Sequence, residues 1–119
     1  MKKLLIASTI TVLTLTSVVS TPKAHATNIG QSICEYIAAD DKKRLRSFLK
    51  TNKLRIRRIF NGIECNGKNL LEFASNRGAV ETGSMMIGKL PKKVVSANLE
   101  TLQTGSQPLI DAAKERVSS

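Results

Sequence analysis

The chain has 119 residues, a formal net charge of +10, 41% hydrophobic residues and only 3% aromatic residues. This length accommodates one small domain, and so many hydrophobic residues exclude a disordered, highly charged chain. Charged residues occur along most of the sequence, which excludes a protein with several membrane spans.

The first 26 residues have the pattern of a secretory signal peptide. Lys2 and Lys3 precede an uncharged, mostly aliphatic run over residues 4–19, and Ala24–Ala26 provides the small residues of a signal peptidase site. The uncharged run is short for a membrane-spanning helix, which needs about 20 residues. We therefore predict cleavage after Ala26, export to the periplasm or the medium, and no transmembrane span in the mature chain.

Cleavage would leave Thr27–Ser119, a chain of 93 residues with a formal net charge of +7. It would also remove His25, the only histidine. The mature chain would then have no histidine, which is the side chain most used for acid–base catalysis and is also a common zinc ligand. We therefore expect no catalytic residue, metal or cofactor, and a small hydrolase is the least favoured function.

The first helix of the mature chain is predicted over about Gly30–Ala39, because isoleucines recur there at every fourth position. Asp40 and Asp41 interrupt the pattern, and either carboxylate can cap the helix that follows. A catalytic or metal-binding pair is less favoured, because adjacent side chains in a turn usually point apart and no histidine joins them.

A second helix is predicted over Lys42–Lys50, where Leu45, Phe48 and Leu49 have helical spacing. Asn52 is expected to end it. Because the turn before this helix is very short, the first two helices are expected to form an αα-hairpin.

The segment Lys53–Phe60 fits two structures. Leu54 and Ile56 alternate with arginines, which is typical of a strand, whereas the spacing of Ile56 to Phe60 is helical. We expect a short helix or an extended finger. Two Asn-Gly turn dipeptides then flank residues 63–65.

A second hairpin is predicted from two more helices. Asn69 is expected to cap a helix over Leu70–Asn76, and Gly78 to break the chain before a helix over Ala79–Gly88. Pro91 then stops this helix. After it we expect one further element, and a terminal helix that begins near residue 106.

Nine cations and no acid occupy the segment 42–58, which is the sharpest functional feature of the sequence. Such a concentration of like charge carries a positive potential that attracts anions. We expect it to contact an anionic envelope component or an acidic protein surface; nucleic acid is less favoured, because the aromatic residues occupy apolar-face positions. A solvated basic face without a ligand remains open. The nine residues are Lys42, Lys43, Arg44, Arg46, Lys50, Lys53, Arg55, Arg57 and Arg58.

Cys34 and Cys65 are the only cysteines. In an exported protein a disulfide would persist, and closing a loop of this size stabilises a fold by about 3–4 kcal/mol. A redox or nucleophilic cysteine is less favoured, because the sequence has no C-x-x-C motif and no histidine to activate a thiolate.

Two resemblances follow from these motifs. The segment Asn66–Gly78 resembles an ankyrin repeat, with Asn-Gly at the turn and Asn69 where that repeat places a capping Thr. From Cys34 to about Val94 the chain resembles a family of small exported bacterial proteins classed as a domain of unknown function. The second resemblance implies an envelope or secreted location and a paired Cys34 and Cys65, and it brings no known activity.

The sequence thus predicts an all-α protein of two short, ankyrin-like helical hairpins, joined by a turn-rich segment and stapled by one disulfide. Its predicted parts are a cleaved signal peptide (1–26), a helical domain (27–94) and a C-terminal extension with a terminal helix (95–119). We expect a non-enzymatic binding module that uses the basic face. The alternative is a structural or stress-related envelope protein without a dedicated ligand. The oligomeric state is left open.

Overall fold

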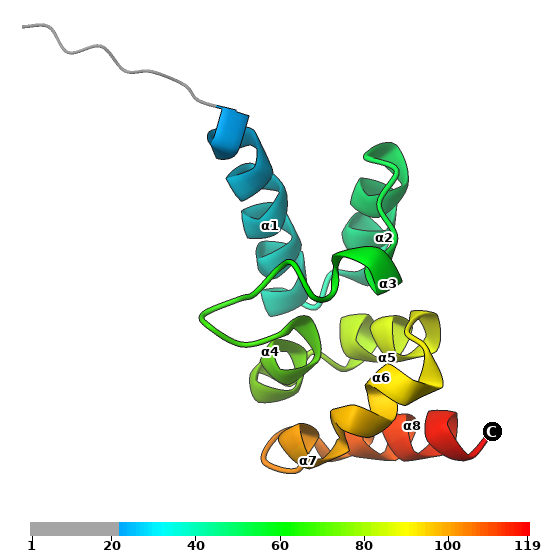
Figure 1. Cartoon of the computed structure of the whole chain (residues 1–119). Coiled ribbons are helices and arrows are strands. Elements are labelled where there is room, and N and C mark those ends of the chain that lie inside the picture. Colours follow the sequence, from blue (N-terminus) through cyan, green and yellow to red (C-terminus); the bar gives the residue numbers. More distant parts are fainter. Residues whose placement is uncertain (1–21) are drawn as a thin grey trace, which may run out of the picture.

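The computed structural model describes the backbone of residues 22–119 and the side chains of residues 28–119. Residues 1–21, which hold most of the predicted signal peptide, lie outside the described residues. Within the described part the chain forms eight helices and no strand (Figure 1). The prediction of an all-α fold is confirmed.

Helices α1 (Pro22–Ala38) and α2 (Lys42–Thr51) form the first hairpin and diverge as a V in Figure 1. Helix α1 begins at Pro22 rather than near Gly30, so it runs across the predicted cleavage position. Proline is favoured as the first residue of a helix, because its missing N–H has no partner there in any case. The isoleucine repeat begins further along the chain, so the helix start that we predicted from it was too late.

The two helices of this hairpin are held together by apolar side chains. Ile33, Ile37 and Leu45 are fully buried, and the rings of Tyr36 and Phe48 meet edge to face with their centroids 5.5 Å apart. The aromatic residues therefore lie on apolar faces, as predicted.

The segment after α2 forms a short helix, one of the two structures that its sequence allowed. Lys53 has a positive φ of 55°, Arg55 is extended, and α3 (Ile56–Ile59) is a single helical turn. Ile56 in α3 and Phe60 directly after it are buried and four positions apart. The helical spacing thus predicted the turn that packs on the core, whereas the strand-like alternation did not, because Ile56 and Arg57 belong to α3.

Helices α4 (Leu70–Arg77) and α5 (Val80–Lys89) form the second hairpin. The side chain of Asn69 accepts a hydrogen bond from the Glu72 N–H over 2.8 Å, and Gly78 ends α4 with a φ of 69°. Both predicted signals are confirmed. The Asn cap satisfies a free N–H at the helix start, and glycine adopts the positive φ at the helix end without strain.

The chain after Pro91 forms three helices: α6 (Lys92–Ala97), α7 (Leu99–Leu102) and α8 (Gln107–Ser118). The single element expected between Pro91 and the terminal helix is therefore two short helices. Helix α8 packs along α5 and α6 (Figure 1), and its Leu109 and Ala113 are fully buried. Residues 95–119 thus contribute to the same hydrophobic core as the two hairpins.

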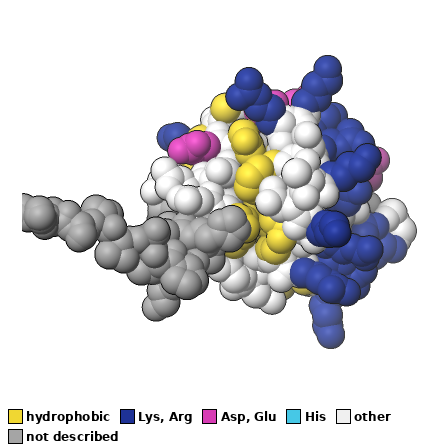
Figure 2. Space-filling model, turned by 90° about the horizontal axis from the view of Figure 1, so that it is seen from above, with side chains coloured by type: hydrophobic (Ala, Val, Ile, Leu, Met, Phe, Trp, Pro, Cys, Tyr) yellow, Lys and Arg dark blue, Asp and Glu magenta, His cyan; other side chains and the backbone are white. Residues whose placement is uncertain are grey.

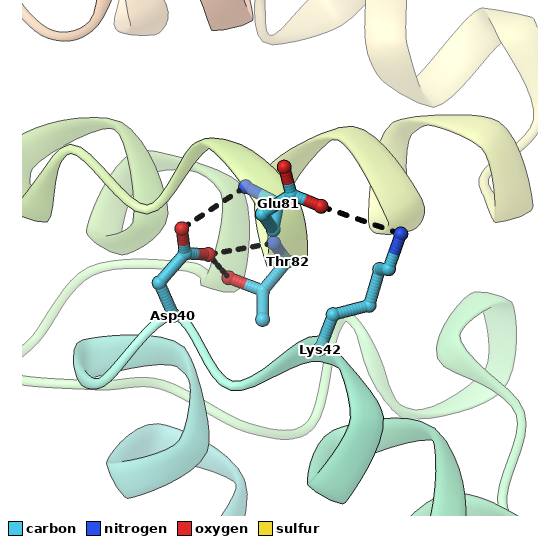
Figure 3. A network of polar contacts seen from close by, with 4 residues as sticks. All are labelled: Asp40, Lys42, Glu81 and Thr82. Atoms are coloured by element: carbon cyan, nitrogen blue, oxygen red, sulfur yellow. Dashed lines mark hydrogen bonds and ion pairs between the residues drawn. The ribbon is translucent and has the colours of Figure 1, made fainter.

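Polar contacts from the turn between α1 and α2 fix the first hairpin against α5 (Figure 3). The Asp40 carboxylate accepts hydrogen bonds from the Glu81 N–H (3.2 Å), the Thr82 N–H (2.8 Å) and the Thr82 hydroxyl (3.1 Å). Asp40 thereby caps α5, whose own N-cap residue makes no side-chain bond. The Lys42 ammonium adds an ion pair to Glu81 over 3.3 Å.

The two aspartates therefore cap different helices. Asp41 accepts a hydrogen bond from the Arg44 N–H over 3.1 Å and caps α2, as predicted for one of the pair. Asp40 caps a helix that lies about forty residues further along the chain, which the sequence pattern did not indicate.

Candidate functional site: a basic groove between α2, α3 and α5

The predicted disulfide is present. Cys34 and Cys65 are joined with a Cα–Cα distance of 5.7 Å, and the bond links α1 to the turn that precedes α4. Cys65 is buried and Cys34 half-buried, and the described residues include no free cysteine. The arrangement fits a structural staple between the two hairpins.

A groove of about 680 Å³ opens between α2, the segment 54–57 and α5. Residues 46 and 50 of α2 both border the groove because they are four positions apart and therefore lie on the same face of the helix. Leu45 and Leu49 point into the core beside them. The residues that line the groove are Arg46, Ser47, Leu49, Lys50, Leu54, Arg55, Ile56, Arg57, Met85 and Lys89.

Half of these lining residues are cations and none is acidic. Four of the nine predicted binding residues are among them, and Lys89 of α5 adds a fifth positive charge from the opposite wall. All five side chains are exposed. In the view of Figure 2, a strip of hydrophobic side chains crosses the middle of the molecule, and most of the basic side chains lie to the right of this strip.

The other five predicted cations lie outside the groove. Lys42 pairs with Glu81, and Arg44 lies 3.6 Å from the Asp41 carboxylate. Exposed positions beyond the groove hold Lys43, Lys53 and Arg58. Lys43 extends the α2 row of basic residues, because it is three and seven positions before Arg46 and Lys50.

The two ion pairs found among the described side chains leave the groove cations without an acidic partner. Five like charges around one concavity raise its positive potential, and the low-dielectric walls concentrate the field. The groove is therefore a place where the charge of the protein attracts an anion.

The floor of the groove is apolar. Leu49 and Ile56 are 8% and 3% exposed, whereas Leu54 and Met85 are half-buried and present surface to the groove. The aliphatic stems of the arginines and lysines add further apolar surface at the rim. The groove thus offers hydrocarbon contact below and positive charge above.

The candidate binding residues predicted from the sequence included neither Lys89 nor Met85. Both come from α5, more than thirty residues after the α2 cations, so only the packing of α5 against α2 and α3 brings them together. Their signal was weak: Met85 adjoins the fully buried Met86, and Lys89 is a common type of residue for a last helical turn.

A second hollow of about 510 Å³ lies beside the disulfide. Glu64 is the single carboxylate among its lining residues, and the described residues contain no group of three His, Cys, Asp or Glu side chains that could hold a metal ion. None of the described helices is both long and apolar enough to cross a membrane. The basic groove therefore remains the candidate site.

Fold and groove together define the class: a small all-α protein, stapled by one disulfide, with a basic groove between its hairpins. The chain matches the family described as "Protein of unknown function (DUF3718)" over residues 33–97, which is more than half of its length, and it belongs to that family. The matched segment includes both cysteines and all ten residues that line the groove. No curated protein and no solved structure matches the chain.

Proposed function

We propose that the protein is a non-enzymatic binding module whose basic groove binds an anionic partner. The observation that carries the proposal is the placement of five exposed cations from α2, α3 with its preceding segment, and α5 around one groove without an acidic residue. Cations that served only solubility would have a lower electrostatic energy if they were spread over the surface, because like charges brought together repel one another.

The chemistry of the groove supports binding rather than catalysis. Its only hydroxyl is that of Ser47, and its lining includes no carboxylate, histidine or cysteine that could activate a nucleophile or transfer a proton. Cations with hydrocarbon beneath them bind and orient an anion.

We also propose that the protein acts in the periplasm or outside the cell. The signal-peptide pattern at its start supports this location, and so does the disulfide, because disulfides persist in oxidising compartments. The partners that fit are an anionic component of the envelope or an acidic protein surface.

The proposal is tested with two soluble polyanions, polyglutamate and inorganic polyphosphate, in fluorescence binding titrations at low and high salt. A double variant, Arg46→Glu with Arg57→Glu, reverses two rim charges. We expect it to weaken binding at least about tenfold, because each lost contact to a charged group is worth about 1.5–3 kcal/mol. High salt should weaken the binding of the unmodified protein as well.

The matched control is Lys93→Glu with Lys114→Glu, which changes the net charge equally at exposed positions on α6 and α8. We expect it to bind nearly as well as the unmodified protein. Equal losses in the two double variants would show that net charge alone governs binding, and would overturn the proposal. Such a result would favour a structural envelope protein without a dedicated ligand.

A further inference from the structure

We infer that the ligand of the groove is an anionic lipid, with its phosphate-bearing headgroup at the basic rim and one acyl chain on the apolar floor. This inference rests on the proposed function and deepens it, because it names the chemical class of the partner. It follows from three properties of the groove: the kind of cation at the rim, the apolar floor, and the size and composition of the cavity.

The rim is suited to phosphate. Three of its five cations are arginines: Arg46, Arg55 and Arg57. A planar guanidinium donates two parallel hydrogen bonds to one phosphate, a geometry that a lysine ammonium does not offer. The ammonium groups of Lys50 and Lys89 add positive charge from α2 and α5, so cations surround a headgroup from both walls.

The floor is suited to hydrocarbon. Leu54 and Met85 are half-buried and face the groove above the buried side chains of Leu49 and Ile56. A methionine adapts its unbranched side chain to ligands of irregular shape. A purely hydrophilic anion, such as a free phosphate, would leave this apolar surface in contact with water.

The size and lining of the cavity favour a single lipid over a macromolecule. About 680 Å³ lies within the range of sites that enclose a small molecule, roughly 300–1,000 Å³. The lining contains no aromatic residue, whereas the energetic centres of protein interfaces are rich in Trp and Tyr and single-stranded nucleic acids stack on aromatic rings. An acidic protein is therefore the less favoured occupant.

The experiment compares three probes by calorimetric titration of the full protein, each below its micelle-forming concentration. Dodecyl phosphate carries both the anion and the chain, glycerol phosphate carries the anion alone, and dodecylphosphocholine carries the chain with a zwitterionic head. We expect dodecyl phosphate to bind at least about tenfold more tightly than either of the others, since burying two methylenes already gives that ratio.

Variants then separate the floor from the rim. Met85→Gln and Leu54→Gln keep the charge and approximate volume of the half-buried floor residues while making them polar. We expect each to weaken dodecyl phosphate several-fold and to leave glycerol phosphate unchanged. Arg46→Glu with Arg57→Glu should weaken both anionic probes, and Lys93→Glu with Lys114→Glu neither. Circular dichroism establishes that each variant is folded before its affinity is compared.

The possible outcomes distinguish the inference from the proposed function. If glycerol phosphate binds as tightly as dodecyl phosphate and the floor variants change nothing, the groove binds anions without a lipid chain, and only the inference is overturned. Tighter binding of polyglutamate than of dodecyl phosphate would instead identify an acidic protein as the partner and also overturn it. Binding of all anions that ignores the rim variant would overturn both.

Discussion

Asp40 connects the two hairpins through a single carboxylate. It lies in the turn between α1 and α2, beside the start of α5. Its φ of 54° is a left-handed conformation that Asp tolerates better than most residues. Its oxygens accept three hydrogen bonds from Glu81 and Thr82 (Figure 3). A negative charge at a helix N-terminus is also favourable because of the helix dipole.

We predict that Asp40→Gly lowers the free energy of unfolding by about 1.5–3 kcal/mol, the range for hydrogen bonds to a charged group. Glycine adopts the positive φ without strain, so the loss reports the hydrogen bonds rather than the backbone. Urea denaturation measures it. Asp41→Ala removes one local cap and should cost only about 1 kcal/mol; equal losses at the two positions would contradict the bridging role of Asp40.

At the scale of the elements, local signals predicted most helix boundaries. Asn69, Gly78 and Pro91 act on their own neighbours, so a sequence pattern detects them. The split between α6 and α7 at Asn98 was missed because it depends on one local and one distant side-chain contact. The buried Asn98 amide donates to the Val94 carbonyl over 2.8 Å and accepts from the Asn69 side chain over 2.7 Å, and such bonds compete with helix continuation.

The packing of α8 on α5 depends on a glycine. A Cβ atom at Gly83 would lie 2.6 Å from a terminal carbon of Leu109, which is fully buried. Gly88, five residues later on the same helix, has nothing within 4 Å of its Cβ position and is exposed. The two glycines therefore differ in their surroundings and not in their helix.

We predict that Gly83→Ala destabilises the protein by about 1–2 kcal/mol, since overpacking outweighs the better helix propensity of alanine. Gly88→Ala should stabilise it by about 0.5–1 kcal/mol, because only the propensity term applies. Thermal denaturation followed by circular dichroism compares the pair. Stabilisation by both substitutions would show that α8 moves away from α5 without cost.

At the scale of the whole molecule, the sequence predicted the groove only in part. The acid-free run located one wall, because its cations are close together in the chain. The other wall comes from α5, and its Lys89 joins the site only through tertiary packing. The same packing brings Glu81 to within 3.3 Å of Lys42, which lies outside the groove and pairs with this carboxylate.

The disulfide is the covalent link between the hairpins, and its cysteines are 31 positions apart in the sequence. We predict that replacing both cysteines by serine lowers the free energy of unfolding by about 3–4 kcal/mol. Denaturation of the variant and of the native protein with and without reductant measures the loss. Mass spectrometry of alkylated protein provides the control; two free thiols in the protein isolated from its native source without reductant would contradict the staple.

The uneven distribution of charge gives the molecule an electric dipole. The α2–α3 side carries its cations without acids along segment 42–58, whereas α8, at the other end in Figure 1, carries Asp111 and Glu115 beside its own cations. Near an anionic surface such a charge distribution experiences a torque that turns the α2–α3 side toward the surface. In the proposed binding, salt would then control how fast the protein arrives, and the contacts within the groove would control how long it stays.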